Sequence, residues 1–383
     1  MFKKKLLRLA KILLSFLISL IPKNNNKILF KSRPDFSGNA KALSDYIQKN
    51  HNDYEIIWLI ENDGNARLNG TKNIKAGTIK AFFEYITAKY IITTHNEMIG
   101  IKSSDQIYIS LWHGMPLKKI CYLGEFDHQG MEDYSSYRIA TSEVMRAIIA
   151  ACFREKANNV YITGQPRNDF LYDKLAAKDL FSTFSAGKTN IFYVPTFREN
   201  QEDKSYSDGE SIKNNNFFRV DDFDFNEVDS FLRTHNCQLF IKLHPYEENV
   251  YLDTLLSENI RILKSEELSK NNLDINHLLA HMDILITDYS SVYFDYMLLD
   301  KPICFLTPDI DSYSRSRGGF TLEPVSYWMP GFHCTTQNAL LNEIKNLIEG
   351  NDQYAKHRKN VNEIINFYKD NRNSERVFER FFH

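Results

Sequence analysis

The sequence lacks the features that mark three common classes of protein. Its five cysteines are odd in number and form no C-x-x-C pair, so we expect neither a disulfide framework nor a structural zinc site, and a reducing compartment fits best. Its formal net charge is only -2, which excludes the overall basic field of a general nucleic-acid-binding protein. The N-terminal apolar run, 12–21, would rise only ~15 Å as a helix, which is too short to span a bilayer. Because the net charge is small, any anionic ligand must be bound by a local group of residues.

What is present is typical of a large, well-packed globular protein. The chain has 383 residues, of which 43% are hydrophobic and 13% aromatic. These fractions argue against a disordered chain. The length exceeds that of one ordinary core, and a size of ~100–200 residues per domain predicts two domains.

The first 24 residues predict an amphipathic helix that associates with a membrane surface. At ~100° per residue, one narrow stripe of this helix carries Lys4, Arg8, Lys11, Ser15 and Ser19, and the opposite side is apolar. Basic residues in such a stripe suit anionic headgroups, so we expect a peripheral protein on the cytoplasmic face of the membrane. A core helix and a signal peptide are the alternatives, although no small-residue cleavage site follows the run.

Residues 25–185 alternate short apolar runs with helical patterns. The apolar runs are rich in Ile, Tyr and Val and predict buried strands. They are KILF (27–30), YEIIWLI (54–60), YIITT (90–94), QIYISLW (106–112), YRIAT (137–141) and NVYIT (159–163). Helical patterns such as 39–50 and 78–89 lie between them. This rhythm predicts a parallel sheet in a Rossmann-like, doubly wound lobe.

A second Rossmann-like lobe is predicted over 186–354, because small and polar residues at 179–190 break the first rhythm. Its strands are expected at 190–195, 237–245, 260–264, 283–288 and 301–306, its helices at 274–282, 291–299 and 338–349, and a polar loop at 201–216. The last patterned segment, 355–383, predicts one long helix that can cross back to the first lobe. The predicted fold class is therefore α/β, with two doubly wound lobes.

Polar and basic residues gather where the predicted strands end. The stretch TDYSS (287–291) could be explained by helix capping alone, because Asp and Ser are preferred caps. However, similar clusters follow four other strands, and parallel sheets bind ligands beyond their carboxyl ends. The residues are His113 and Gly114; Arg167, Asn168 and Asp169; Arg198; His244 and Pro245; and Asp288, Ser290 and Ser291. Their common position indicates a ligand site.

Seven short motifs, in order, resemble those of the CDP-glycerol glycerophosphotransferase family, which includes teichoic acid primases and polymerases and related capsule enzymes. They are LWHGMPLKKI (111–120), ITGQPRND (162–169), YVPTFRE (193–199), IKLHP (241–245), ITDYSSVYFDY (286–296), RGGF (317–320) and MPG (329–331). The resemblance implies a GT-B-like fold in a protein of the bacterial cell envelope. It also implies transfer of glycerol phosphate, or a similar polyol phosphate, from a CDP-activated donor to a hydroxyl of a lipid-linked saccharide or polyol-phosphate acceptor, with release of CMP.

The resemblance also implies a role for each motif residue. His113 is the expected general base and His244 a second catalytic residue, because imidazoles titrate near neutrality. The residues expected to bind the CDP-polyol are Arg198, His244, Pro245, Thr287, Asp288, Ser290, Ser291, Arg315 and Arg317. Those expected near the acceptor are Gly114, Lys118, Lys119, Arg167, Asn168 and Asp169. No metal ligand and no obligatory cofactor are expected, although Mg²⁺ can assist with a pyrophosphate.

Several positions depart from the family's usual motifs, with Met115 where Thr is common and an extra Gly in RGGF. These departures leave open the polyol, the acceptor and the choice between primase and polymerase. A nucleotide-sugar glycosyltransferase on the same fold, and a catalytically silent membrane-bound nucleotide-binding protein, remain the alternative functions.

Overall fold

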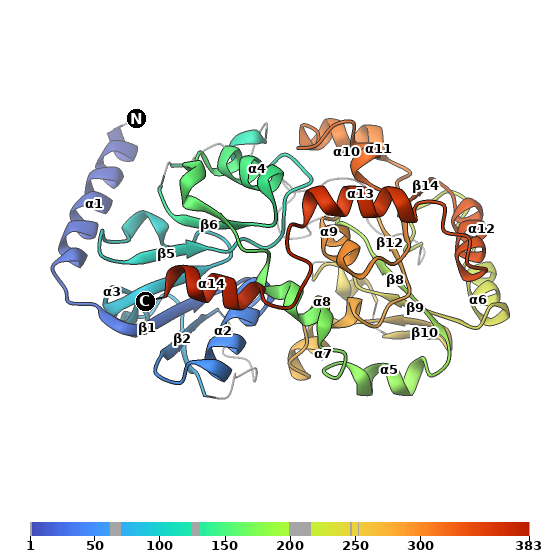
Figure 1. Cartoon of the computed structure of the whole chain (residues 1–383), viewed down its shortest axis with the longest axis horizontal. Helices are drawn as coiled ribbons and strands as arrows, with labels where there is room; N and C mark the ends of the chain where they lie inside the picture. Colours follow the sequence, from blue (N-terminus) through green and yellow to red (C-terminus); the bar gives the residue numbers. More distant parts are fainter. Residues whose placement is uncertain are drawn as a thin grey trace. The chain divides into compact units, whose positions relative to one another are not determined.

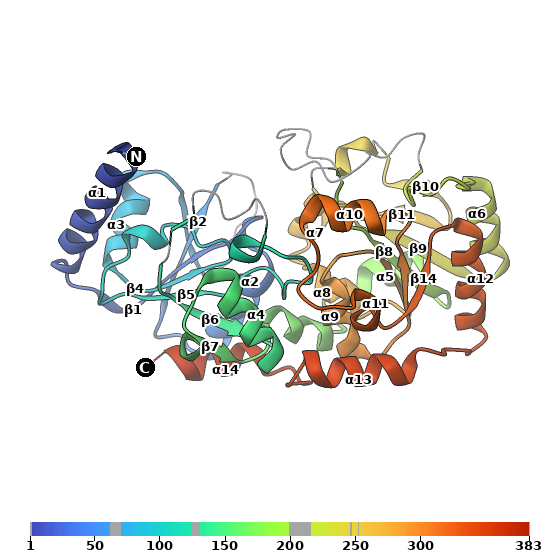
Figure 2. The ribbon, with the colours of Figure 1, turned by 90° about the horizontal axis from the view of Figure 1, so that it is seen from above.

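The computed structural model describes residues 2–61, 70–124, 131–132, 134–198, 216–245, 247–251 and 253–382. The chain forms two compact units, each built around its own sheet (Figures 1 and 2). The first unit contains Met1–Met115, Gln129–Phe170 and Phe367–His383, and the second contains Pro116–His128 and Leu171–Asn366. The change of unit after Phe170 comes earlier than the predicted boundary near 185. The predicted α/β class is confirmed.

The first unit contains a seven-stranded parallel sheet in the order β3-β2-β1-β4-β5-β6-β7. Its strands are β1 (Asn24–Lys31), β2 (Glu55–Ile60), β3 (Lys72–Lys75), β4 (Ala88–Thr93), β5 (Ile107–Ser110), β6 (Tyr137–Ala140) and β7 (Val160–Ile162). All six predicted strands are confirmed. Strand β3 was not predicted, because Ile74 is its one buried residue and a single apolar side chain gives no periodic signal.

Helices cover both faces of this sheet. Alternate strand residues such as Phe30 and Trp58 pack with α2 (Gly38–Asn50) and α14 (Asn373–Phe381) in one core cluster. Their neighbours Leu29 and Ile57 pack in a second cluster with residues of α1 (Phe2–Ser19) and α3 (Ile79–Thr87). Side chains that alternate between two covered faces explain why the strands are apolar throughout.

The second unit contains another seven-stranded sheet, in the order β10-β11-β9-β8-β12-β13-β14. Its strands are β8 (Thr189–Val194), β9 (Cys237–Ile241), β10 (Leu255–Ser257), β11 (Ile260–Ile262), β12 (Ile284–Thr287), β13 (Ile303–Leu306) and β14 (Phe332–Cys334). Among these strands β10 pairs antiparallel and the others pair parallel. The five predicted strands are confirmed, whereas the three-residue edge strands β10 and β14 were too short to be predicted.

Further helices complete the two units, and one of them, α5, corrects a detail of the sequence analysis. They are α4 (Glu143–Phe153), α5 (Lys178–Phe184), α6 (Phe225–Thr234), α7 (Ser265–Lys270), α8 (Ile275–Leu279), α9 (Val292–Tyr296), α10 (Ile310–Arg317), α11 (Val325–Trp328), α12 (Gln337–Ile348) and α13 (Ala355–Ile365). Helix α5 occupies part of the stretch at 179–190 that was expected to break the alternation of strands and helices. The ring of its Phe181 packs on the ring of Phe240, with centroids 5.0 Å apart.

The C-terminal segment forms two helices, α13 and α14, rather than the one that was predicted. Helix α13 ends at Ile365. The amide of Phe367 donates to the carbonyl of Thr141 and not to a carbonyl one turn earlier in α13, so the helical hydrogen-bond pattern does not continue. Residues 367–383 then belong to the first unit, where α14 packs against α2. The loop predicted over 201–216 lies, apart from Asn216, outside the described residues.

Helix α1 lies within the predicted segment 1–24, but two residues of its polar stripe contact the protein. Lys11 donates to Glu132 at 3.2 Å and to the hydroxyl of Tyr134 at 3.0 Å, and the Ser15 hydroxyl donates to the carbonyl of Lys102. Lys11 and Ser15 therefore contact the protein and are partly buried. The side chains of Lys4 and Arg8 lie outside the described set. Among the helices within the described ranges, none combines the length and the apolarity needed to cross a bilayer.

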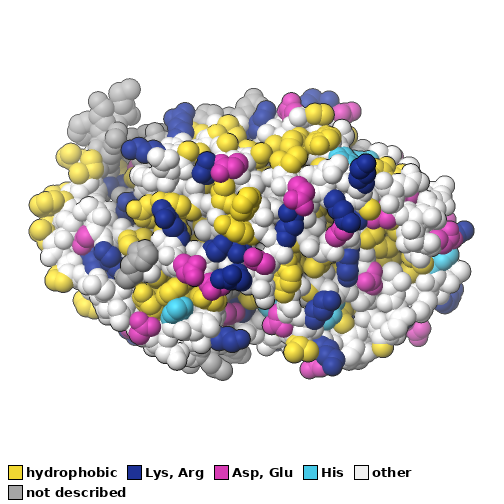
Figure 3. All heavy atoms as spheres, in the orientation of Figure 1, with side chains coloured by type: hydrophobic (Ala, Val, Ile, Leu, Met, Phe, Trp, Pro, Cys, Tyr) yellow, Lys and Arg dark blue, Asp and Glu magenta, His cyan; other side chains and the backbone are white. Residues whose placement is uncertain are grey.

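The outward side of α1 is apolar. The exposed apolar side chains are Leu6, Leu7, Leu9, Ile12, Leu13, Phe16 and Leu17 of α1 and Leu20 directly after it, each at least half accessible. Figure 3 shows hydrophobic side chains along this edge of the first unit. On the neighbouring helix α3, Ile79, Phe82 and Phe83 are exposed as well, and Ile79 is 90% accessible. We call these residues of α1 and α3 the apolar face of the first unit.

Candidate active site

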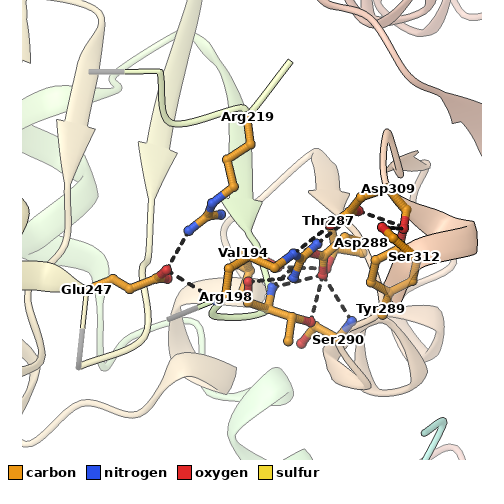
Figure 4. A network of polar contacts seen from close by, with 11 residues as sticks. Val194, Arg198, Arg219, Glu247, Thr287, Asp288, Tyr289, Ser290, Asp309 and Ser312 are labelled. Atoms are coloured by element: carbon orange, nitrogen blue, oxygen red, sulfur yellow. Dashed lines mark hydrogen bonds and ion pairs between the residues drawn. The ribbon is translucent and has the colours of Figure 1, made fainter. Parts of the chain in front are cut away.

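The strand order of the second unit places two of the predicted motifs side by side. Strand β8 lies between β9 and β12, so the chain turns from one half of the sheet to the other at the β8–β12 pair. Such a switch point is where parallel sheets bind ligands, beyond the carboxyl ends of the strands. Arg198 follows β8 and Asp288 follows β12, and the two side chains meet there (Figure 4).

Arg198 is held by protein groups on several sides. Its Nη2 donates to Asp288 Oδ2 at 2.8 Å, its Nε donates to Asp309 Oδ2 at 3.0 Å, and its Nη1 donates to the carbonyl of Thr196 at 2.9 Å. The side chain is almost fully buried. Burial alone would lower the pKa of Arg198, but Asp288 and Asp309 raise it above its ordinary value. One guanidinium cation therefore faces two carboxylates in a buried network.

Asp288 joins the loops that follow β8 and β12. It accepts hydrogen bonds from the amide of Thr196 at 2.8 Å, from the Thr196 hydroxyl at 2.8 Å and from the amide of Ser290 at 3.2 Å, in addition to that from Arg198. The carboxylate is thus occupied by protein donors. Thr287 also acts within the sheet, since its hydroxyl donates to the carbonyl of Val194 at 2.7 Å. Ser290 and Ser291 are partly exposed just before α9.

Two tyrosines extend this network, and sequence reasoning did not single them out. Tyr289 donates to Asp309 Oδ1 at 2.9 Å, and its ring stacks on Tyr313 with a centroid separation of 4.2 Å. The guanidinium carbon of Arg198 lies 4.8 Å from the centroid of the Tyr313 ring. Burial raises the pKa of Tyr313, so this side chain is neutral at pH 7. No local pattern marks Tyr313, because it is the one aromatic residue of α10 (Ile310–Arg317) and stands among polar residues.

His244 follows β9, the other neighbour of β8. Its ring lies 4.6 Å from that of Phe197, and the side chain is only partly exposed. Burial lowers the pKa of His244 to about 4, and the positive charges of Lys242 and Lys118 act in the same direction. His244 is therefore neutral at pH 7, where it can donate or accept a hydrogen bond. The next residue, Pro245, is exposed.

The remaining residues predicted to bind the CDP-polyol are placed less closely. Arg315 is exposed on α10. Arg317 ends the same helix, and its side chain lies outside the described set. Neither is linked by a described contact to the network around Arg198.

In the first unit, His113 follows β5 and its imidazole is exposed. Its Nδ1 lies 3.3 Å from the carbonyl oxygen of Thr94. A carbonyl oxygen can only accept, so Nδ1 carries the proton in this contact, and Nε2 is the nitrogen with the lone pair in the neutral ring. The ring also stacks on His95, with centroids 4.3 Å apart and planes inclined by 11°. This tautomer suits a base that acts through Nε2.

His95 was missed by the sequence analysis, although the same reasoning could have found it. It follows YIITT (90–94), the strand that became β4, and so lies at the carboxyl edge next to His113. Its Nδ1 is 2.9 Å from the hydroxyl of Thr94. Burial lowers the pKa of His95 to about 4, and Arg33 and Lys31 add to the effect. The partner that stacks on His113 is therefore an uncharged ring at neutral pH.

The motif after β7 supports the His113 loop. Arg167 Nη1 donates to the carbonyl of His113 at 2.8 Å, and its amide donates to Asn39 Oδ1 at 3.1 Å. The Asn39 amide donates in turn to the carbonyl of Trp112 at 3.0 Å. Gly114 adopts a φ of 147°, which favours glycine, so the turn after His113 has a sequence requirement of its own.

Asn168 is buried, and Asp169 is bound by protein donors. Asn168 is 2% accessible. Asp169 accepts from the amides of Asn373 and Ser374, at 2.9 and 2.8 Å, and so anchors the start of α14. Burial raises the pKa of Asp169, although these hydrogen bonds oppose the shift. Its geometry favours a structural role over contact with the acceptor.

Lys118 and Lys119 belong to the second unit, although the resemblance grouped them with the first-lobe acceptor residues. The other residues expected near the acceptor belong to the first unit, as does the expected base His113. They are Gly114, Arg167, Asn168 and Asp169. Within the described ranges, no group of three or more His, Cys, Asp or Glu side chains has the arrangement of a metal site.

Comparison with known proteins assigns this architecture to a family. The model of the CDP-glycerol:poly(glycerophosphate) glycerophosphotransferase family matches residues 13–383. A teichoic acid poly(glycerol phosphate) polymerase of Bacillus spizizenii is 27% identical over 384 residues, covering 92% of this chain and 89% of that protein. The teichoic acid ribitol-phosphate polymerase TarK of Staphylococcus aureus is 26% identical over 390 residues, covering 94% and 69%.

A solved structure shows the same fold. The wall teichoic acid polymerase TagF superposes with a TM-score of 0.77 at 21% identity, covering 99% of this chain and 96% of that one. The fold of the present chain is therefore TagF-like and GT-B-like. With a family match that spans both units, the chain belongs to the CDP-glycerol:poly(glycerophosphate) glycerophosphotransferase family.

Proposed function

We propose that the protein transfers a polyol phosphate from a CDP-polyol to a hydroxyl of a lipid-linked cell-envelope acceptor. In this reaction the acceptor oxygen attacks the phosphorus next to the polyol and forms a new P–O bond. The bond between this phosphorus and the bridging oxygen breaks, and CMP leaves with the electron pair. Transfer of this kind depends mainly on positioning and charge stabilisation. The observation that carries the proposal is the family match across both units.

His113 is the proposed base. Its exposed ring can meet a substrate, and the contact of Nδ1 with Thr94 leaves the lone pair on Nε2. The acceptor proton would pass to this nitrogen as the new bond forms. Arg167 and Asn39 then act as positioning residues, because their hydrogen bonds hold the backbone on either side of the ring.

The CDP-polyol is proposed to bind at the switch point of the second unit. Ser290, Ser291 and neutral His244 supply hydrogen-bonding groups at this carboxyl edge. Arg198 and Asp288 would act by fixing the loops that present these groups, because their own polar atoms already bind each other. Mg²⁺ can assist the pyrophosphate, but the proposal requires no metal.

The acceptor side includes a membrane surface. The apolar face of the first unit offers a row of exposed Leu, Ile and Phe side chains on α1 and α3. Large exposed apolar patches mark interaction sites, and a lipid-linked substrate must be reached at the bilayer. We propose that this face rests on the cytoplasmic leaflet as a peripheral contact.

A screen of activated substrates tests the reaction. The protein is incubated with CDP-glycerol, CDP-ribitol and a panel of nucleotide sugars, together with a soluble acceptor analogue. Release of CMP from a CDP-polyol supports the proposal and identifies the polyol, which matters because the relatives include both glycerol- and ribitol-phosphate polymerases. Release of a nucleoside diphosphate from a nucleotide sugar would instead support a glycosyltransferase. Nucleotide binding with no turnover of any substrate would indicate a catalytically silent protein.

A further inference from the structure

The segment after His113 leaves the first unit and pairs with the RGGF motif of the second. Lys118 and Phe320 form an isolated antiparallel bridge. The amide of Lys119 donates to the carbonyl of Gly319 at 3.1 Å, and the amide of Thr321 donates to the carbonyl of Leu117 at 2.8 Å. These bonds fix the backbone of 117–119 against 319–321 within the second unit.

The two lysines of this segment have different surroundings. Lys118 Nζ lies 5.8 Å from the centroid of the Tyr313 ring, which is the ring beside Arg198. Lys119 Nζ lies over Gly319 instead, where a Cβ would meet it at 3.3 Å and would also approach Glu323. Successive residues of an extended segment point to opposite sides, which explains the separation. Only Lys118 is therefore directed at the switch-point network.

Lys118 also acts electrostatically on His244. Its positive charge is one of the causes that lower the pKa of His244. Lys118 thus acts on His244, which follows β9, and lies against Tyr313, which packs on the residues that follow β8 and β12. The lysine belongs to the edge where parallel sheets bind ligands.

The predicted CDP-polyol site needs positive charge near the pyrophosphate, and Lys118 is placed to supply it. Arg198 is neutralised by two carboxylates, and His244 is neutral at pH 7. A pyrophosphate carries negative charge before the reaction, and more charge develops on the leaving phosphate. Hydrogen bonds from a cation to such oxygens are about twice as strong as neutral ones. The paired Arg198 and the neutral His244 therefore balance this charge poorly by themselves.

We propose that Lys118 is a cation of the nucleotide site and that its ammonium binds the pyrophosphate of the CDP-polyol. The inference rests on the proposed function for the identity of the substrate, and it moves Lys118 from the acceptor to the activated substrate.

The test compares Lys118→Gln with the matched variant Lys119→Gln by equilibrium binding to the full chain. The probes are CDP-glycerol, CDP and cytidine. We expect Lys118→Gln to weaken CDP-glycerol and CDP at least tenfold and cytidine less than twofold. Lys119→Gln should change the affinity for each probe less than twofold, and Lys118→Arg should recover most of the lost affinity because it keeps the charge. Unchanged thermal midpoints would show that the variants are folded.

Other outcomes separate this inference from the proposed function. If the wild-type protein binds CDP but turns over no CDP-polyol, the proposed function fails, and a selective loss of CDP binding in Lys118→Gln still supports the inference. Equal losses in the two glutamine variants, or a loss for cytidine as large as for CDP, would overturn it. It is also overturned if Lys118→Gln raises only the KM for the acceptor, or if the wild-type protein binds neither CDP nor CDP-glycerol.

Discussion

Nη2 of Arg198 lies 2.8 Å from Oδ2 of Asp288, and both side chains are almost fully buried. This contact joins the loops after two neighbouring strands, β8 and β12, whose pairing forms the switch point of the second sheet. It explains why an aspartate stands at the end of a buried strand, directly before two serines. The aspartate holds the loops together, and Ser290 and Ser291 remain at the edge where a ligand can reach them.

Removing the charge of Asp288 should destabilise the protein. Asp288→Asn leaves Arg198 with one carboxylate partner and places amide hydrogens near the amide of Thr196. We expect a loss of about 1.5–3 kcal/mol in the free energy of unfolding, the range for one buried hydrogen bond to a charged group. Denaturant unfolding measures it. Asp311→Asn is the matched control, because Asp311 is exposed, and its effect should stay within about 0.5 kcal/mol. Equal stability of the two variants would contradict the structural role.

His113→Ala should reduce turnover without reducing the affinity for the CDP-polyol. A general base acts mainly in the transition state, so kcat should fall by about 10²-fold or more. The acid limb of the pH–rate profile should also disappear from the residual activity. His235→Ala, at the end of α6 in the other unit, serves as the control. If His113→Ala loses nucleotide binding instead, the base must be sought elsewhere.

His244→Ala and Ser290→Ala should weaken the binding of the CDP-polyol. Their proposed partners are phosphate oxygens that are already present in the ground state. A hydrogen bond to a charged group contributes ~1.5–3 kcal/mol, which corresponds to about a 10- to 100-fold loss of affinity for each variant. Isothermal titration with CDP-glycerol measures this. Unchanged affinity in both variants would move the pyrophosphate away from this edge.

Two histidines should make the fold sensitive to acid. Burial lowers the pKa of His95 and of His244 to about 4 in the folded protein, whereas an unfolded histidine titrates near ~6.5. Between these values the unfolded chain binds more protons, so the free energy of unfolding should fall as the pH drops from ~6.5 to about 4. The partly buried Glu97 acts in the opposite direction, because desolvation raises its pKa.

Substitution separates these contributions. We expect His95→Gln and His244→Gln each to flatten the pH dependence of the unfolding free energy in this window, measured by denaturant titration at several pH values. A slope that is unchanged in both variants would show that the two rings do not remain neutral in the folded state.

The apolar face of the first unit should mediate membrane binding. Leu9 and Leu13 are 65% and 59% accessible, so Leu9→Gln combined with Leu13→Gln should leave the fold intact. We expect this variant to sediment severalfold less with vesicles that contain anionic lipid. Leu175→Gln combined with Leu255→Gln is the matched control, because both residues are exposed in the second unit. If the control variant is released equally, the contact is not specific to α1.

The sequence alone determined the class of fold, and it predicted a site at the carboxyl edge of the sheets. Parallel strands covered on both faces need nearly continuous apolar runs, so they could be identified one by one. Polar residues such as His113 and Asp288 were found because they interrupt those runs at the carboxyl end. The short strands β3, β10 and β14 lacked enough apolar residues to give the same signal.

Only the tertiary structure decided which of these residues bind one another. Arg198 contacts carboxylates 90 and 111 positions away in the chain, and no local period records such pairings. Asp169 became an anchor for α14 because the chain returns to the first unit after Asn366. Lys118 joined the second unit because its backbone pairs with the RGGF segment. Strand patterns depend on burial, which repeats along the sequence, whereas the chemistry of the site depends on partners that folding brings together from distant positions.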